Sequence, residues 1–388
     1  MSLPPPPGSF GSVPPNGGGG PSWGGQPQQP GQPYGAPYQG QPGGQWGPPQ
    51  QWAGGPPPNK GGKGKWILIG LALVAVIAVS VVATVLVLRP ESGGGGGSTP
   101  AAQNGNSEFA SANDTGPANI ISEDPTCEAW MRVARDYSAK AQSVGWANRD
   151  PHVPASAWSA EQRTAYETVG KALADAAEPT ENLAKQTPHR VMRELYGQFV
   201  TYSRAFSSAV PTYEPSMDGL VNVAGTLHAA LSAMCGAVDY KSVQSTAPLV
   251  AEPAAPTSVA QPSGTPEKFV DSSSDSVCKD WLSLIEQFDK DTAQWVTVDA
   301  NISASEWTPE QKSIYEAVVP VMRTQADSME KLGRSSNNPI LEDFAVLSSQ
   351  YMRAYVVAIP HYTASDNFLS DSSRFLTSTI VWACRSAS

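Results

Sequence analysis

The chain has 388 residues, with 35 acidic and 25 basic side chains, and a formal net charge of −10. All of the acidic residues lie after Arg89, where only 21 of the basic ones are found, so residues 90–388 carry a formal charge of −14. A surface of that sign disfavours nucleic acid or an anionic membrane surface as a binding partner of this region.

Residues 1–59 contain no Asp, Glu, Lys, Arg or His and consist largely of Pro, Gly, Gln, Ser and Asn. Such a segment has too little aliphatic surface to offset the entropy of its chain. We therefore expect a disordered tail, which offers an adaptable contact surface to a cytoplasmic partner.

Residues 60–89 are typical of a membrane anchor. Trp66–Leu88 is a run of 23 uncharged, mostly aliphatic residues, which at about 1.5 Å per residue spans a hydrocarbon core of about 30 Å. Three lysines precede the run closely, whereas one arginine follows it. The positive-inside rule then predicts a single-pass protein of the cell membrane with a cytoplasmic N-terminus and an extracytoplasmic C-terminal region.

The C-terminal half contains one pattern twice. Cys127-Glu-Ala-Trp130 recurs as Cys278-Lys-Asp-Trp281, and from Trp146 onward the two copies align without a gap at a shift of 149 residues. The residues kept in both copies are mostly aromatic, proline and cysteine. This composition indicates a conserved architecture more than a conserved chemistry.

Composition divides the extracytoplasmic region into four segments. Residues 90–124, rich in Gly, Ala, Asn and Ser, are predicted to be a flexible linker, and residues 239–275, rich in Pro, Ala and Ser, a second one. Residues 125–238 and 276–388 are the two repeats, and each is long enough to form its own core.

Within each repeat the apolar residues recur at steps of three and four, which predicts four helices per repeat. Ser159 and Thr308, each followed three residues later by Gln, are typical of helix starts with a capping box. The predicted fold is therefore all-α: one transmembrane helix followed by two tandem four-helix-bundle repeats.

The four cysteines all lie on the predicted outer side, where disulfides persist. In an up-down-up-down bundle the start of the first helix lies beside the end of the fourth. The simplest of the three possible pairings is then Cys127 with Cys235 and Cys278 with Cys384. Each bond would close a loop of more than 100 residues, for which loop entropy predicts about 4 to 5 kcal/mol of stabilisation.

Catalytic and cofactor motifs are missing from the sequence: it has no Gly-x-Ser-x-Gly, phosphate loop, His-Glu-x-x-His or Cys-x-x-Cys. The four histidines are isolated, and the shift of 149 residues relates none of them to another histidine. We therefore expect no enzyme activity, no metal site and no cofactor.

An arginine in the third helix of each repeat, Arg204 and Arg353, is kept between the copies. Three interpretations are open. The arginine points to solvent, it pairs with a kept acid such as Glu161 or Glu310, or it binds an anionic ligand near Tyr213 or Tyr362. The candidate ligand or partner contacts are Tyr202, Arg204, Tyr213, Tyr351, Arg353 and Tyr362.

Four tryptophans of the repeats also have two interpretations. They either stack on sugar rings at a surface or pack in the core, and their helical spacing favours the core. These residues are Trp130, Trp158, Trp281 and Trp307.

Four features occur together in this chain. They are the leader motif Gly-Gln-Pro-Tyr-Gly-Ala-Pro-Tyr at 31–38, the lysine-flanked anchor, and the Trp-x-x-Glu-Gln and Arg-Ala-aromatic motifs of both repeats. The combination resembles single-pass membrane proteins of actinobacteria, above all mycobacteria, with a Cys-bracketed helical domain outside the membrane. The resemblance implies a place in the cell envelope and supplies no catalytic residues.

From these patterns we expect a non-enzymatic envelope protein whose helical bundles dock a protein partner or an envelope component. The alternative is an extracytoplasmic module that binds a lipid or small ligand in a gap between helices near Arg204 or Arg353.

Overall fold

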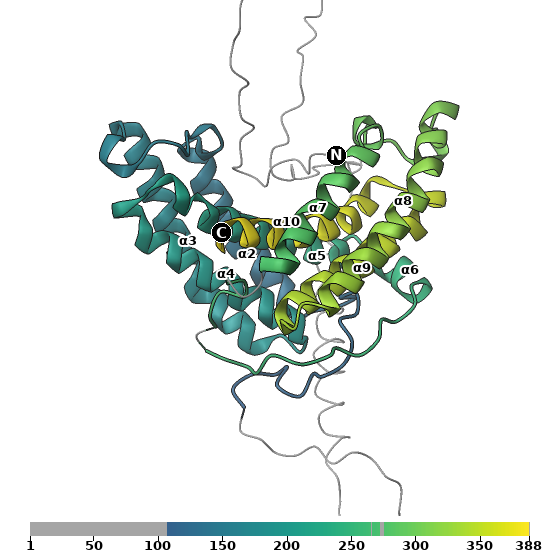
Figure 1. Cartoon of the computed structure of the whole chain (residues 1–388), viewed down its shortest axis with the longest axis horizontal. Coiled ribbons are helices and arrows are strands. Elements are labelled where there is room, and N and C mark those ends of the chain that lie inside the picture. Colours follow the sequence, from purple (N-terminus) through teal and green to yellow (C-terminus); the bar gives the residue numbers. More distant parts are fainter. Residues whose placement is uncertain (1–106, 265, 272–274, 388) are drawn as a thin grey trace, which may run out of the picture. The chain divides into compact units, whose positions relative to one another are not determined.

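The computed structural model describes residues 107–264, 266–271 and 275–387. The predicted tail and the predicted membrane anchor lie outside these residues. Within the described part of the chain all regular structure is helical, as predicted (Figure 1).

Each repeat contains four long helices. In the first they are α2 (Cys127–Ser143), α3 (Ala160–Gln186), α4 (Arg190–Ala209) and α5 (Asp218–Asp239). In the second they are α7 (Asp275–Asp291), α8 (Pro309–Arg334), α9 (Pro339–Ala358) and α10 (Asn367–Ala387). A short helix, α6 (Ser242–Thr246), lies between the repeats. The 3-10 helices are η1 (Trp146–Asn148), η2 (Ala155–Ala157), η3 (Val210–Thr212), η4 (Pro215–Met217), η5 (Ala247–Leu249), η7 (Trp295–Thr297), η8 (Ala304–Glu306), η9 (Ile359–His361) and η10 (Ala364–Asp366).

The helix starts follow the sequence signals. The Thr308 hydroxyl accepts from the Gln311 amide, and the Gln311 side chain caps the Thr308 amide in return, with Pro309 at the first helical position. Ser159 caps α3 in the same way, but the side chain of Gln162 donates to the carbonyl of Asp150 instead. The full capping box is therefore present in the second repeat, and half of it in the first.

In each repeat every long helix contacts the helix before it and the helix after it, and the first helix also contacts the fourth. This is the closed four-helix arrangement that the sequence predicts. Its core is aromatic, with Trp130 and Trp281 completely buried at equivalent positions.

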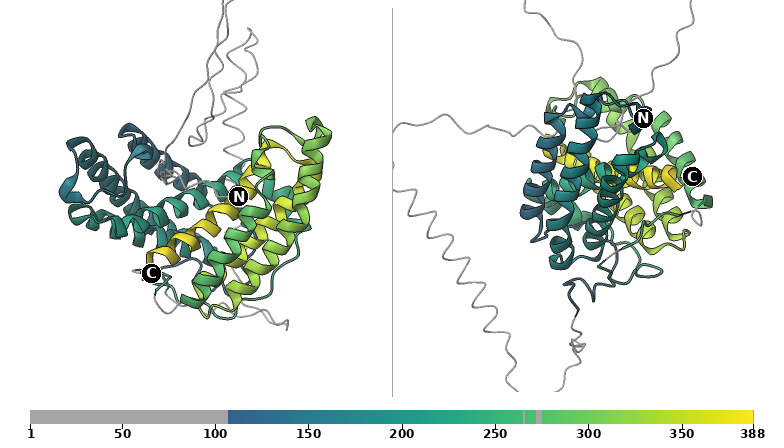
Figure 2. Two further views of the ribbon diagram at one scale, coloured as in Figure 1. Left: turned by 45° about the horizontal axis from the view of Figure 1, so that its top comes forward. Right: turned by 90° about the vertical axis from the view of Figure 1, so that its left-hand side faces the viewer.

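The two repeats share one continuous core rather than two separate ones. Their main contact is between α5 and α10, seen side by side in Figures 1 and 2. Gly219 near the start of α5 approaches Ser386 at the end of α10, and Gly236 near the end of α5 approaches Phe368 at the start of α10. The two helices are thus antiparallel. Because α5 and α10 are equivalent in the duplication, the repeats are related by an approximate twofold axis.

The two linkers are more ordered than predicted in their described residues. Phe109 and Ile121 of the first, and Val243 and Phe269 of the second, are buried in the structure. Small polar residues outnumber these few apolar ones in both segments, so composition predicted free spacers. The described residues of both linkers therefore include side chains that pack onto the helices, contrary to the expectation of free spacers.

One described segment, Pro215–Asp239, is long and apolar enough to cross a membrane. It consists of η4 and α5, and most of its apolar stretch is buried inside the protein. Its apolar character is explained by its packing between the two repeats.

Candidate functional site

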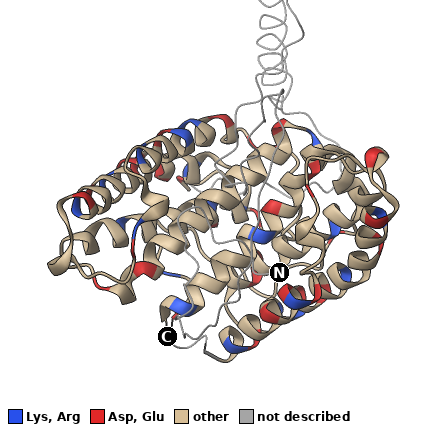
Figure 3. Ribbon diagram, turned by 90° about the horizontal axis from the view of Figure 1, so that it is seen from above, with Lys and Arg blue, Asp and Glu red and all other residues tan. Residues whose placement is uncertain are grey.

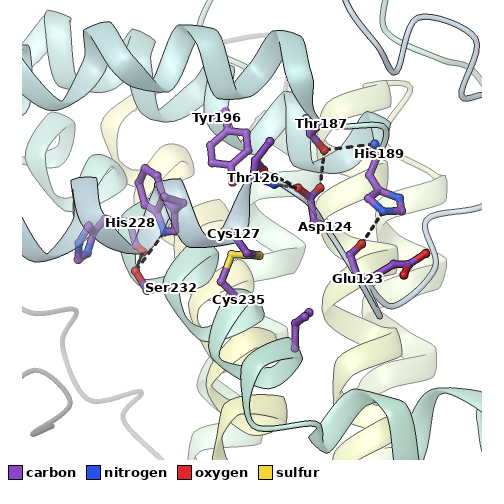
Figure 4. The surroundings of a disulfide bond; sticks show 12 residues. Glu123, Asp124, Thr126, Cys127, Thr187, His189, Tyr196, His228, Ser232 and Cys235 are labelled. Atoms are coloured by element: carbon purple, nitrogen blue, oxygen red, sulfur yellow. Dashed lines mark hydrogen bonds between the residues drawn. A yellow bond between two sulfur atoms is a disulfide. The ribbon is translucent and has the colours of Figure 1, made fainter. Parts of the chain in front are cut away.

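The two disulfides are those predicted. Cys127 is bonded to Cys235, with 5.2 Å between the Cα atoms, and Cys278 to Cys384, with 5.3 Å between them. Each bond joins the start of the first helix of a repeat to the end of the fourth, and Figure 4 shows the bond of the first repeat. The cysteines therefore close the bundles.

A hydrogen-bond network surrounds the entry to α2 next to the first disulfide (Figure 4). The Asp124 carboxylate accepts from the Thr126 amide at 2.7 Å and from the Thr187 hydroxyl at 2.5 Å. The hydroxyls of Thr126 and Tyr196 lie 2.9 Å apart. These bonds attach the end of the first linker to the α3–α4 turn and to α4, so the network is structural.

The kept arginines pair with kept acids, but not with the predicted ones. Arg204 Nη1 lies 2.5 Å from Glu181 Oε1, and Arg353 Nη1 lies 2.7 Å from Glu330 Oε2. Glu181 and Glu330 are themselves related by the shift of 149 residues. Glu161 and Glu310 lie in the first turn of α3 and α8, more than four turns of helix away from these carboxylates. Both arginines thus pair with a kept acid other than Glu161 or Glu310, and the side chain of Arg204 is also 48% exposed to solvent.

The four candidate tyrosines are buried. The Tyr213 hydroxyl donates to the Pro151 carbonyl at 2.8 Å, and the Tyr362 hydroxyl donates to the equivalent carbonyl of Ala300. Tyr202 and Tyr351 lie in α4 and α9. Burial raises the pKa of all four hydroxyls, so they remain protonated. These tyrosines fix loops and helices to the core.

Trp130, Trp158 and Trp281 are buried in the core, and Trp307 packs against it while partly buried. Trp158 stacks on Tyr166 with 4.2 Å between ring centroids, and Trp307 stacks on Tyr315 at 3.8 Å. The indole nitrogens of both donate to backbone carbonyls, at Val153 and Ile302. The two repeats thus share the same tryptophan–tyrosine stacking and the same indole hydrogen bond.

The copies differ in one buried ion pair. In the first repeat Arg149 Nη2 lies 2.7 Å from Asp218 Oδ1, and its guanidinium lies 4.0 Å from the centre of the Trp146 ring. The equivalent positions in the second repeat hold Val298 and Asn367, and neither can form this pair. A pocket of about 160 Å³ lies there, with both residues in its lining.

A cluster of buried charges joins α4 to α9. Arg190 is completely buried and its guanidinium binds the Asp343 carboxylate in a bidentate manner, at 2.7 and 2.8 Å. Glu194 lies next to them, 3.5 Å from Arg193 and 3.9 Å from Arg190, which is too far for hydrogen bonds. Desolvation and the neighbouring Asp343 raise the pKa of Glu194 well above its ordinary value.

The same arginines hold both linkers. Arg190 donates to the carbonyls of Asp114 and Gly116, and Arg193 donates to those of Ser111 and Ala260. The sequence interpretation did not find this cluster. The available signal was that Glu194 and Asp343 are equivalent acids in the duplication.

Elsewhere charges of both signs are mixed on the helices of both repeats (Figure 3). Lys312 and Glu316, for example, are an exposed pair 3.9 Å apart on α8. The described part of the chain holds no group of three or more His, Cys, Asp or Glu side chains arranged to bind a metal ion.

The chain belongs to the family described as Mycobacterial ESX-1 associated protein, whose model matches residues 109–388. It is also similar to an uncharacterized protein of Mycolicibacterium smegmatis (strain MKD8), with 43% identity over 350 residues, which cover 88% of this chain and 91% of that protein. The resemblance to mycobacterial proteins is therefore confirmed. No solved structure matches the chain.

Proposed function

We propose that the protein is a non-enzymatic component of the mycobacterial cell envelope, and that its helical repeats dock a protein of the ESX-1 secretion system. The observation that carries the proposal is the family match, which extends over both repeats and not over a single motif. The shared core and the buried Arg190–Asp343 pair support it, because they hold the two repeats as one preformed surface.

Site-specific crosslinking in living mycobacteria tests this proposal. A photoreactive amino acid would replace Leu249, whose side chain is 68% exposed, or Tyr240, at 55%. Lys171, exposed on α3, is the control position. We expect a crosslink from the apolar positions to an ESX-1 component that disappears in a strain without the ESX-1 genes. Identical crosslinked proteins in both strains would rule out docking to ESX-1 through these positions.

The alternative, a ligand module near Arg204 or Arg353, has less support at that location, because carboxylates already bind both arginines. The pocket of the second repeat is lined by the neighbouring Met352 and Tyr355, and Arg353 is not among its lining residues.

A further inference from the structure

The pocket of the second repeat is enclosed by all four of its helices. Phe288 comes from α7, Met322 and Gln325 from α8, Tyr355 from α9 and Thr377 from α10. Its volume of about 160 Å³ is close to that of an engineered apolar cavity of about 150 Å³ that binds benzene. The space therefore fits a single six-membered ring.

The pocket opens near η7. Val296 lines it and is 44% exposed, an unusual exposure for a large apolar side chain in this structure. Trp295 is half-buried there, whereas the equivalent Trp146 of the first repeat is buried. The lining of the pocket thus reaches the surface at η7, between the second repeat's first and second helices.

At two of the equivalent positions the first repeat has a larger side chain. Arg149 stands where the second repeat has Val298, and it lies against Trp146 while pairing with Asp218. His228 stands where the second repeat has Thr377, with its ring 5.0 Å from the centre of Tyr137. At both positions the second repeat has the shorter side chain, and both residues line its pocket.

The lining indicates the chemistry of the occupant. It contains four aromatic rings, of Phe288, Trp295, Tyr315 and Tyr355, and three methionines. Aromatic rings favour an aromatic neighbour, and the flexible thioethers of methionine adapt to its outline.

One polar group in the lining has no partner. Gln325 is 5% exposed, and its Nε2 atom has no hydrogen-bond partner in the described part of the chain. The first repeat has Ala176 at this position. A buried amide N–H without an acceptor is costly, so an occupant that brings an oxygen acceptor is favoured.

We propose that this pocket binds a small aromatic molecule of about one ring that carries an oxygen acceptor for Gln325. The site is independent of the docking function proposed above.

Fluorine NMR of 4-fluorophenol with the folded full chain in detergent tests the proposal. For a ligand of this size we expect a dissociation constant on the order of 1 mM. The double variant Val298→Arg with Asn367→Asp rebuilds the ion pair of the first repeat and fills the space, so it should weaken binding by at least about tenfold. Helix content and melting temperature of the variant check that it is folded.

A second comparison tests the amide and does not depend on the filled variant. Fluorobenzene has the same ring without the oxygen, so Gln325→Ala should weaken binding of 4-fluorophenol and leave binding of fluorobenzene nearly unchanged. Equal losses for both ligands would overturn the role of Gln325. If the wild type does not bind 4-fluorophenol, the proposed site is wrong. It is also wrong if the folded double variant binds 4-fluorophenol as tightly as the wild type does.

Discussion

At the scale of single residues, the charges between α4 and α9 are the most constrained. Arg190 and Asp343 are each about 1% exposed at the side chain, so neither has water as an alternative partner. Removing one member of such a pair leaves the other buried and uncompensated. The free energy of unfolding therefore falls more when one member of the pair is removed than the intact pair adds to it.

Arg190→Met should lower the free energy of unfolding by about 3 to 5 kcal/mol, because Asp343 loses its bidentate partner in a buried site. Urea unfolding followed by circular dichroism measures the change. Arg204→Met is the matched control in the same helix, and with a side chain 48% exposed it should cost less than about 1 kcal/mol. Equal losses in the two variants would contradict this account of the cluster.

Glu194 should make stability depend on pH. Its pKa is raised in the folded protein above its ordinary value of 4.5, so its contribution to stability is complete below about pH 4.5 and is lost as the pH rises through the folded pKa. The charged groups that act on it are Asp343, Arg190 and Arg193.

Glu194→Gln should therefore stabilise the protein at pH 8 and have little effect near pH 4.5. The gain at pH 8 is expected because the amide stays neutral where the buried carboxylate would be charged. Melting temperatures of both proteins between pH 4.5 and pH 8 measure it. Parallel curves for the two proteins would show that Glu194 does not titrate in this range.

Duplication made some of these residues predictable. Retention of Arg204 and Arg353 indicated an ion pair, and a search for acids kept at the same shift would have included Glu181 and Glu330 beside Glu161 and Glu310. Retention does not reveal which acid is near, because that depends on how α3 packs against α4. The role of Arg190 could not be predicted from the duplication, because the equivalent residue is Pro339 and the partner of Arg190 lies in the other repeat.

At the scale of elements, helices and caps were well predicted because their signals are local. These signals are the apolar period, the helix-capping residues Ser159 and Thr308, and the prolines after the third helices. Each lies within a few residues of the helix boundary that it determines. The linkers were not well predicted, because their order comes from distant partners. Phe269, for example, packs on Phe344 with 5.2 Å between ring centroids, and its amide donates to Gln198.

The close approach of α5 and α10 depends on Gly236. A Cβ atom placed there would lie 2.5 Å from the Phe368 ring, and that ring is already stacked on Tyr240. Gly236→Ala should therefore cost about 1 to 3 kcal/mol through overpacking. Chemical unfolding of Gly236→Ala, Phe368→Ala and the double variant measures the coupling. If the alanine is equally costly without the Phe368 ring, the clash is not its cause.

At the scale of the whole molecule, the sequence predicted two bundles in tandem, and the structure shows them fused about an approximate twofold axis. The strongest hint of the fusion was the apolar character of Pro215–Asp239, which exceeds what one face of a bundle needs. The pocket was unpredictable, because it arises from differences between the copies, whereas the sequence interpretation followed what the copies share.

The predicted topology can be tested on intact cells. A membrane-impermeant thiol reagent should label a cysteine introduced at Ser98 and not one introduced at Ser22, because the lysine flank predicts a cytoplasmic N-terminus. Lysed cells, in which both positions should react, are the control. Labelling at Ser22 and not at Ser98 in intact cells would reverse the predicted orientation.

The attachment of the first linker has a mechanical consequence. The chain enters the helical body at residues 107–124, which are held by Arg190 and Arg193, and Arg190 is bound in turn to Asp343 of the second repeat. A pulling force applied at residue 107 is thus transmitted to both repeats through the same side chains. The contacts nearest residue 107 are to α3, where Glu108 pairs with Lys185 at 2.8 Å and the Ala110 amide donates to the Lys185 carbonyl. Such a force therefore reaches α3 of the first repeat before it reaches the charge cluster.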